Sequence, residues 1–168
     1  IPLSVKIGPY FSSLPHMARE MVDAGARGLV LFNRFYQPDI DLENLRVEAR
    51  VHLSPPTALL LPLRWIGILK GQVPANLAIT SGVDSAEDAI KALLVGADVT
   101  MMASTLLRHG PERISMILED MQLWLDENEY ESVDQMRGSM SIGSAANPDA
   151  FVRANYMKML TTYTSKVT

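Results

Sequence analysis

Hydrophobic and polar positions divide this chain into two kinds of segment. Short, nearly continuous apolar runs predict strands that are buried on both faces of a parallel sheet. Longer stretches carry apolar residues at helical spacing, as expected for helices that bury one face. We expect four strands, at residues 3–7, 29–32, 77–80 and 99–102.

The expected helices alternate with these strands, and each begins near a residue that suits a helix start. The candidate starts are Ser12 or Ser13, Pro62, Asp84 or Ser85, and Gly110-Pro111-Glu112. The tail adds a short segment at 132–136, a polar loop at 143–148 and a helix over residues 149–163. Alternating strands and helices make a parallel sheet the expected architecture.

One sequence pattern occurs twice: a helix end, a Gly-Ala pair, a short apolar strand, then small or polar residues. It occupies residues 23–33 and again residues 94–104. Gly25 and Gly96 suit the left-handed conformation that ends a helix. In α/β barrels the chemistry lies where such strands end. The candidate functional residues are therefore those that follow each strand.

Four strand–helix units amount to half of an eight-unit barrel. We expect residues 1–140 to form half of a (β/α)8 TIM barrel and residues 141–168 to form a C-terminal helical extension. Residues 34–58 are predicted to be a long connection, rich in proline and charge. A loop of that length inside a compact domain is uncommon and often functional.

Composition narrows the class of protein. The net charge of −4 over 168 residues gives no support for binding nucleic acid or an anionic membrane. The absence of cysteine excludes disulfides, thiolate metal sites and a cysteine nucleophile, and it fits a cytoplasmic location. No apolar run approaches the roughly 20 residues that cross a bilayer, since Arg64 and Lys70 interrupt the best candidate. The start at Ile1, inside a strand-like run, suggests a piece of a longer protein.

Two turns at strand ends are candidates for binding a phosphate group. In Thr80-Ser81-Gly82-Val83, a small residue and a glycine let backbone N–H groups approach an anion, and the following helix adds positive potential. In Met102-Ala103-Ser104-Thr105, small residues enter a short helical turn. Each turn alone is equally typical of an ordinary strand-to-helix connection. Together, on neighbouring strands, they could clamp one phosphate.

Two further polar residues belong to the first two strands. Lys6 lies in an otherwise apolar run, so its ammonium group must reach water, a partner or a ligand; the alternative is an edge-strand lysine that faces solvent. Asn33 ends its strand with donors and acceptors available, although a turn-forming asparagine explains it as well. Arg34 can pair with an anion, or with Asp39 or Asp41.

The remaining candidate groups indicate no separate site. His16, His52 and His109 show no metal spacing and no accompanying carboxylate cluster, so we expect no metal. The methionines lie mostly at core spacing. Tyr156 and Tyr163 are expected to pack the last helix onto the body or onto another subunit.

A set of ordered motifs resembles the dihydroorotate dehydrogenase family, which are FMN enzymes on an α/β barrel. Residues 5–11, Val-Lys-Ile-Gly-Pro-Tyr-Phe, resemble the family's Val-Lys-Leu-x-Pro-Tyr-Phe segment. Phe32-Asn33 resembles its substrate-contacting strand end. Residues 79–83 and 101–104 are similar to its Gly-Thr-Gly-Gly-Val and Gln-x-Gly-Thr turns. Further similar motifs, some typical of the dihydroorotate dehydrogenase-like branch, lie at residues 33–39, 61–65, 109–111 and 130–138.

The resemblance covers residues 1–140 and corresponds to the C-terminal half of the barrel, strands five to eight. It implies FMN as cofactor, with its phosphate held by backbone N–H groups. Lys6 would lie near the flavin pyrimidine edge, where a cation stabilises reduced flavin. Asn33 would bind a planar substrate. The implied cofactor-binding residues are Lys6, Ser81, Gly82, Ala103 and Ser104.

The chain also departs from the family pattern. The loop that bears the family's catalytic base lies in the half that this sequence does not contain. Arg34 stands where the named enzymes usually have a small residue, and residues 53–56 replace a glycine-rich segment. Ser81 replaces a glycine of the phosphate turn, which makes the backbone approach tighter.

These observations predict an FMN-dependent, dihydroorotate dehydrogenase-like oxidoreductase of pyrimidine biosynthesis, with little turnover by this chain alone. The alternative is a non-catalytic flavin- or phosphate-binding half-barrel that self-associates. Open sheet edges predict a homo-oligomer or association with the other half of the barrel. Two other hypotheses are a purely structural piece and an aldolase or lyase with Lys6 as Schiff base.

Overall fold

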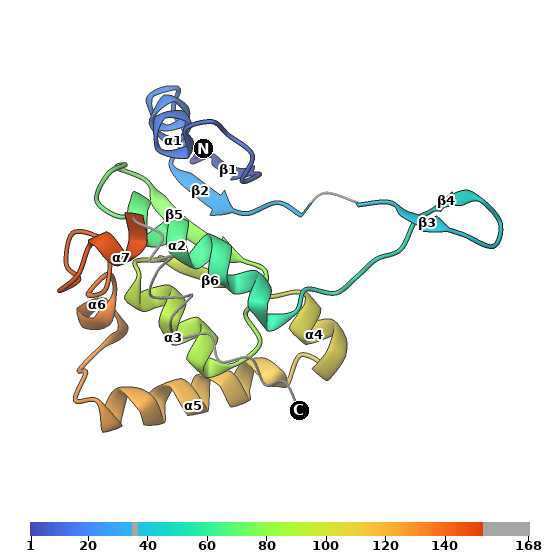
Figure 1. Ribbon diagram of the computed structural model, residues 1–168. Helices are drawn as coiled ribbons and strands as arrows, with labels where there is room; N and C mark the ends of the chain where they lie inside the picture. The colour runs from blue at the N-terminus through green and yellow to red at the C-terminus, as the bar shows by residue number, and fades with distance from the viewer. Residues whose placement is uncertain (35–36, 153–168) are drawn as a thin grey trace, which may run out of the picture.

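The computed structural model describes residues 1–34 and 37–152 (Figure 1). Four parallel strands form one sheet in the order β1-β2-β5-β6, and they confirm the four predicted strands. The strands are β1 (Ser4–Ile7), β2 (Gly28–Leu31), β3 (Asp39–Asp41), β4 (Arg46–Glu48), β5 (Asn76–Thr80) and β6 (Val99–Met101). The helices are α1 (Leu14–Asp23), η1 (Pro56–Leu59), α2 (Leu60–Leu69), α3 (Ala86–Leu94), α4 (Ser104–His109), α5 (Arg113–Glu127), α6 (Val133–Met136) and α7 (Asp149–Val152).

The two faces of the parallel sheet differ. On one face, Leu29, Leu31 and Ile79 are 0% exposed, because this face forms the core with the helices. On the other face the strand register places Lys6, Val30, Ala78 and Val99 in one row. Val99 is 51% exposed and Lys6 is exposed too, whereas Val30 is 9% exposed, so among the described residues this second face is open at its two edge strands and covered in the middle.

The recurring Gly-Ala pattern ends two helices in the same way. Gly25 and Gly96 have φ angles of +110° and +112°, as predicted for left-handed helix ends. A Cβ on Gly96 would lie 2.5 Å from Cγ of Lys70. Glycine at position 96 therefore permits both the turn and the close passage of the Lys70 side chain.

A charged cluster closes the amino-terminal end of the sheet. Asp98 accepts hydrogen bonds from the Leu77 N–H at 2.8 Å and from Arg137 Nη1 at 3.0 Å, and Lys70 Nζ lies 3.5 Å away. Burial by itself would raise the pKa of Asp98, but these hydrogen bonds and the Lys70 charge outweigh burial and lower it. Asp98 therefore joins β5 and β6 to the segment after α6.

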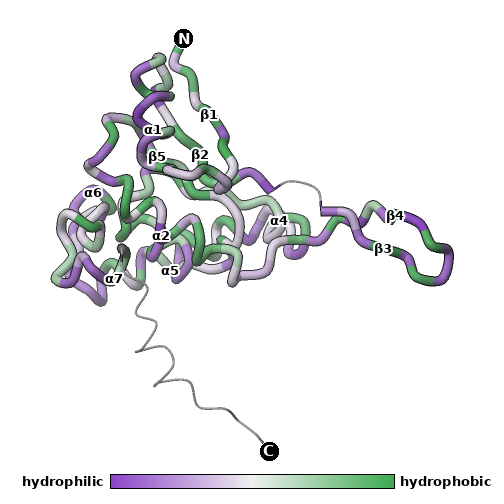
Figure 2. Tube along the Cα trace, turned by 45° about the horizontal axis from the view of Figure 1, so that its top comes forward, coloured by the Kyte–Doolittle hydropathy of each residue, from purple (hydrophilic) through white to green (hydrophobic). Residues whose placement is uncertain are grey.

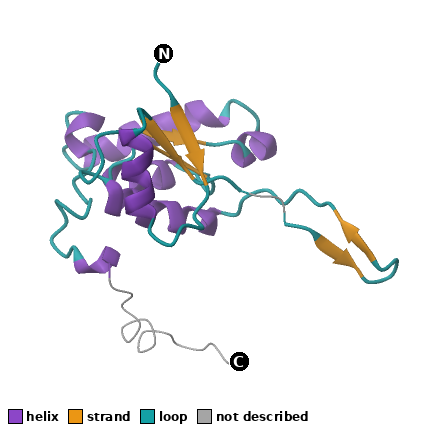
Figure 3. Cartoon of the chain, turned by 90° about the horizontal axis from the view of Figure 1, so that it is seen from above, coloured by secondary structure: helices purple, strands orange, loops and turns teal. Residues whose placement is uncertain are grey.

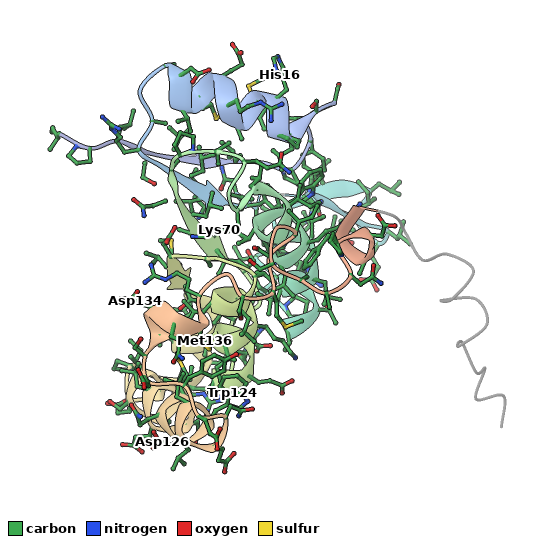
Figure 4. All side chains as sticks on the ribbon, turned by 90° about the vertical axis from the view of Figure 1, so that its left-hand side faces the viewer. His16, Lys70, Trp124, Asp126, Asp134 and Met136 are labelled. Carbon is green, nitrogen blue, oxygen red and sulfur yellow. The ribbon has the colours of Figure 1, made fainter. Side chains whose placement is uncertain are left out.

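The last described helices pack against the outside of the body. Met136 of α6 is fully buried in the core, and Trp124 of α5 is partly buried and packs against that core (Figure 4). Trp124 stacks on Tyr130 with ring centroids 5.7 Å apart. Arg64 Nε of α2 donates to the Phe151 carbonyl of α7 at 2.8 Å. The predicted helix over residues 149–163, with Tyr156 and Tyr163, lies mostly outside the described residues.

Residues 34–58 differ from the predicted irregular connection. Within them, β3 and β4 pair as an antiparallel hairpin, and η1 begins at Pro56. The hairpin projects from the body as an arm (Figures 1 and 3). Each strand has only three residues, which is too short for an alternating pattern to be recognised from sequence.

Candidate functional site

A cavity of about 190 Å³ lies at the carboxyl ends of the four parallel strands. This is the end at which α/β barrels carry their sites. Five residues that the sequence singles out line this one cavity, namely Lys6, Ser81, Gly82, Ala103 and Ser104. They follow or belong to three different strands, so the fold brings together residues that are almost 100 positions apart in the sequence.

The turn after β5 requires glycine at one position. Ser81 and Gly82 have φ angles of +81° and +75°, both in the left-handed region. A Cβ on Gly82 would lie 2.4 Å from the Leu59 N and 2.8 Å from the Pro56 carbonyl oxygen. These are backbone atoms of η1 and cannot move like a side chain. Gly82 therefore lets the phosphate-type turn pass directly against η1.

Backbone N–H groups of both turns at the cavity have no acceptor among the residues that the structure describes. Among the described residues, no oxygen accepts from the N–H of Gly82, Val83, Ala103 or Ser104. Gly82 and Val83 are buried, and buried N–H groups are normally paired with protein, water or a ligand, whereas Ala103 is exposed. By contrast, the N–H groups of Asp84 and Ser85 both donate to Asp88 Oδ2 at 3.1 Å, inside the capping box of α3. The unpaired donors are thus concentrated in the two predicted phosphate turns.

The charges around the cavity favour an anion. Lys6 and Arg34 both line it, and neither pairs with a carboxylate among the described residues. Asp84 is the one carboxylate of the lining, and its Oδ1 lies 2.8 Å from Thr105 Oγ1 and 3.4 Å from Arg108 Nη1. Two cations without a carboxylate partner and the N–H groups without an acceptor, all among the described residues, fit a phosphate group.

Ser54 is a component of the site that the sequence did not single out. Its N–H donates to Ser104 Oγ at 3.0 Å, and its Oγ accepts from Arg34 Nη1 at 2.8 Å. Its carbonyl accepts from Arg108 Nη2 at 2.7 Å. The alternatives of Asp39 or Asp41 as partners of Arg34 are not seen, since Asp41 pairs with Arg46. Arg108 lies four positions after Ser104 on α4, and residues at this spacing share one face of a helix. This spacing could have identified Arg108 as a neighbour of the turn.

A second cavity, of about 330 Å³, lies beside the first and contains Asn33. Phe32, Arg34, Thr80 and Ser81 line both cavities. The Asn33 N–H donates to the Ile7 carbonyl at 2.6 Å, which fixes its backbone next to β1. Asn33 is therefore placed next to the phosphate-type turns, in the neighbouring space rather than among them.

The described part of the chain offers no metal cluster, because no three His, Cys, Asp or Glu side chains come together in it. No histidine lines either cavity. None of the helices in the described ranges is long and apolar enough to span a membrane. The site thus offers cations, hydroxyls and N–H donors, without a free carboxylate or imidazole to act as a base.

The fold and site define a class of protein: half of an α/β barrel with a cavity at the carboxyl ends of its strands, lined by Lys6, Arg34 and the turns after β5 and β6. The solved structure of ligand-free DHODH from Eimeria tenella has the same fold, with a TM-score of 0.65 and 19% identity. The alignment covers 82% of this chain and 39% of that chain. This likeness confirms the half-barrel that the sequence predicts.

Curated proteins that are similar in sequence are also named dihydroorotate dehydrogenase. The chain is 29% identical over 142 residues to the dihydroorotate dehydrogenase B (NAD(+)) catalytic subunit of Geotalea uraniireducens, and 30% identical over 142 residues to that of Pelobacter propionicus. Each match covers 83% of this chain and 46% of the relative. No family model matches the chain. The resemblance inferred from the motifs is confirmed: the chain is dihydroorotate dehydrogenase-like and corresponds to the C-terminal half of those proteins.

Proposed function

We propose that this chain carries the flavin phosphate site of a dihydroorotate dehydrogenase-like oxidoreductase. The observation that carries the proposal is that, among the described residues, N–H groups of both turns lack acceptors and lie in one cavity with two cations that lack carboxylate partners. A dianionic phosphate satisfies both features at once. FMN is the cofactor that the motif resemblance to the dihydroorotate dehydrogenase family implies for this position.

The residues of the site would have three different roles: binding the phosphate, placing a charge beside the flavin ring, and binding the substrate. The N–H groups of Gly82, Val83, Ala103 and Ser104 would hold the phosphate oxygens. Lys6 Nζ would place a positive charge beside the ring system, where it favours negative charge. When bound, FMN supplies hydride-accepting chemistry that side chains lack. Asn33 would orient a planar substrate in the second cavity, since an amide both donates and accepts.

The sizes of the two cavities support this division. The first, at about 190 Å³, is smaller than the roughly 300–1,000 Å³ of typical cofactor-sized pockets. It therefore suits the phosphate end of a nucleotide, while the second cavity and the open part of the sheet face leave room for the rest. Arg34 borders both cavities and would place a cation between cofactor and substrate.

The reaction of the whole protein is also a proposal, because the chain spans about half the length of the curated relatives it matches. We propose oxidation of dihydroorotate or a related CH–CH substrate, in pyrimidine biosynthesis and in the cytoplasm. The described cavity linings contain no free base, so a proton acceptor must come from elsewhere. We therefore expect negligible dihydroorotate oxidation by the 168-residue chain alone.

FMN titration of the purified chain, followed by flavin fluorescence, tests the proposal. We expect saturable binding, weakened about tenfold in Lys6→Met, since a charge-assisted contact contributes about 1.5 kcal/mol or more. The matched control is Lys91→Met, which removes a lysine that pairs with Glu87 on the surface of α3. A folded chain that does not bind FMN, or equal affinities for Lys6→Met and Lys91→Met, would contradict the proposal.

A second candidate function is a flavin-binding half-barrel that self-associates without turnover. The observation that favours it is the position of β1 and β6 at the two ends of the sheet, each paired on one side only in the described chain. Unpaired edges of this kind promote association. Co-expression with the N-terminal half of a named relative separates the two candidates. Restored dihydroorotate oxidation supports the enzyme, and bound flavin with no oxidation supports the self-associating half-barrel.

A further inference from the structure

The second cavity has one charged side chain among the described residues that line it, and that side chain is Arg34. The chain changes from hydrophobic to hydrophilic just after β2, where Arg34 lies (Figure 2). The other polar side chains of this lining are neutral amides and hydroxyls: Tyr10, Asn33, Gln37, Thr57, Thr80 and Ser81. A ligand in the second cavity therefore meets one positive charge and, within the described lining, no negative charge.

Arg34 is supported by a neutral partner that is itself fixed. Its Nη1 donates to Ser54 Oγ at 2.8 Å. Ser54 is 8% exposed, and it is held by Ser104 through its N–H and by Arg108 through its carbonyl. A guanidinium group has five N–H donors in a planar fork. In the described chain one of its nitrogens is bonded, and no carboxylate balances its charge. The remaining donors suit a carboxylate, which can accept two parallel hydrogen bonds.

Lys6 and Arg34 are divided between the two cavities. Lys6 lines the first cavity and does not line the second. An anion in the first cavity can therefore be balanced by Lys6 and by the N–H groups of the two turns. An anion in the second cavity has Arg34 as its one cationic partner in the described lining. The charges thus favour two separate anionic groups, one in each cavity.

Part of the second cavity is apolar. Pro9, Pro55, Leu61 and Pro62 contribute to its lining. Leu61, in the first turn of α2, is 47% exposed, so a ligand that covers it removes apolar surface from water. The volume of about 330 Å³ falls within the roughly 300–1,000 Å³ of pockets that hold small molecules. One cation, neutral amides and an apolar wall together fit an acid that also carries an apolar group.

We propose that Arg34 determines the substrate specificity of this site. The second cavity takes an organic acid whose carboxylate pairs with the Arg34 guanidinium and whose apolar group packs against Leu61 and Pro62. This inference rests on the proposed function for the view that the bound acid is oxidised there. It goes beyond that function by requiring an apolar group, which dihydroorotate lacks. A neutral or cationic molecule would cover Arg34 without pairing its charge, which is costly.

Calorimetric titration of the purified chain with 2-naphthoate and with its neutral amide, 2-naphthamide, tests the role of Arg34. We expect the acid to bind at least about tenfold more tightly than the amide, since a charge-assisted pair is involved. Arg34→Met should abolish this preference. Arg34→Lys should keep part of it, because the charge remains while the planar fork is lost. The matched control is Arg19→Met, an exposed arginine of α1 that lines neither cavity, which should keep the full preference.

The apolar wall is tested with Leu61→Ser and two acids of equal charge. We expect 2-naphthoate to bind at least about fivefold more weakly to this variant, and orotate, whose ring is polar, to bind as before. Equal losses for the two acids would overturn the apolar requirement. Equal affinities of the unmodified chain for acid and amide, or a preference that survives Arg34→Met, would overturn the role of Arg34.

The same titrations with and without FMN separate this inference from the proposed function. An Arg34-dependent preference for the acid in a chain that does not bind FMN would support the inference and contradict the proposed function. FMN binding by a chain without that preference would overturn the inference alone.

Discussion

The backbone N–H of Ser54 donates to the hydroxyl oxygen of Ser104 at 3.0 Å, which joins two residues 50 positions apart. This bond fastens the segment that returns from the arm to the turn after β6. Ser54 is also contacted by Arg34 and Arg108, so the segment that returns from the arm and the rim of the first cavity form one hydrogen-bonded unit.

Removing the Ser104 hydroxyl should loosen this unit. Ser104→Ala leaves the buried Ser54 N–H without its acceptor, and we expect a loss of about 1 kcal/mol in the free energy of unfolding. Hydrogen exchange of the Ser54 amide should accelerate. Unchanged exchange at Ser54 would show that this bond does not fasten the segment. Ser115→Ala, on the exposed surface of α5, serves as the control.

Ser81 is a serine in a conformation that favours glycine. Its φ of +81° costs a non-glycine residue about 1–2 kcal/mol. We expect Ser81→Gly to stabilise the chain by about 1 kcal/mol in urea unfolding and to retain FMN binding, since only backbone N–H groups are needed at this turn. A destabilised Ser81→Gly would instead mean that the hydroxyl has a role of its own.

Gly82 is expected to tolerate no side chain. In Gly82→Ala the new Cβ would overlap the Leu59 N at 2.4 Å, and the φ of +75° adds strain. We predict a loss of about 2–3 kcal/mol in the free energy of unfolding, and weaker FMN binding because the turn must shift. The control is Gly143→Ala, where nothing lies within 4 Å of the new Cβ and we expect little change. Equal effects at the two positions would refute the tight turn.

Asp98 should make stability depend on pH in the acidic range. Its folded-state pKa is lowered below the ordinary value of 3.8, so its stabilisation is complete above that value and is lost as the pH falls through the folded-state pKa. We expect Asp98→Asn to cost about 2 kcal/mol at pH 7, since Lys70 loses its carboxylate partner and Arg137 keeps only Asp134.

Urea unfolding of both proteins between pH 7 and pH 2 measures this effect. The difference in free energy of unfolding between the unmodified chain and Asp98→Asn should shrink towards the acidic end. A difference that stays constant with pH would contradict the assignment. Asp120→Asn, which changes an exposed carboxylate on α5, should show little difference from the unmodified chain at any pH.

Much of the scaffold could be predicted because its signals are local. The apolar runs of β2 and β5 and the glycines at positions 25 and 96 depend on burial and backbone conformation at single positions. The two turns with Gly82 and Ser104 could be proposed as one site because parallel strands place their carboxyl ends together.

Other features depend on contacts between distant residues, which no local pattern records. Ser54 joins the site only because three partners from other segments converge on it. The arm was predicted as an irregular connection because its turn uses Asp41 and a left-handed Leu45 rather than an Asn-Gly pair. The cross-strand pair of Ile40 with Val47 becomes apparent only from the strand register.

The most direct test of the proposed phosphate site compares FMN with riboflavin, which has the same ring system but no phosphate. If the unpaired N–H groups of the two turns bind phosphate, the purified chain should bind FMN at least about 100-fold more tightly than riboflavin, since two charge-assisted hydrogen bonds contribute about 3 kcal/mol. Added inorganic phosphate should compete with FMN. Equal affinities for FMN and riboflavin, measured by flavin fluorescence on a folded chain, would contradict the account.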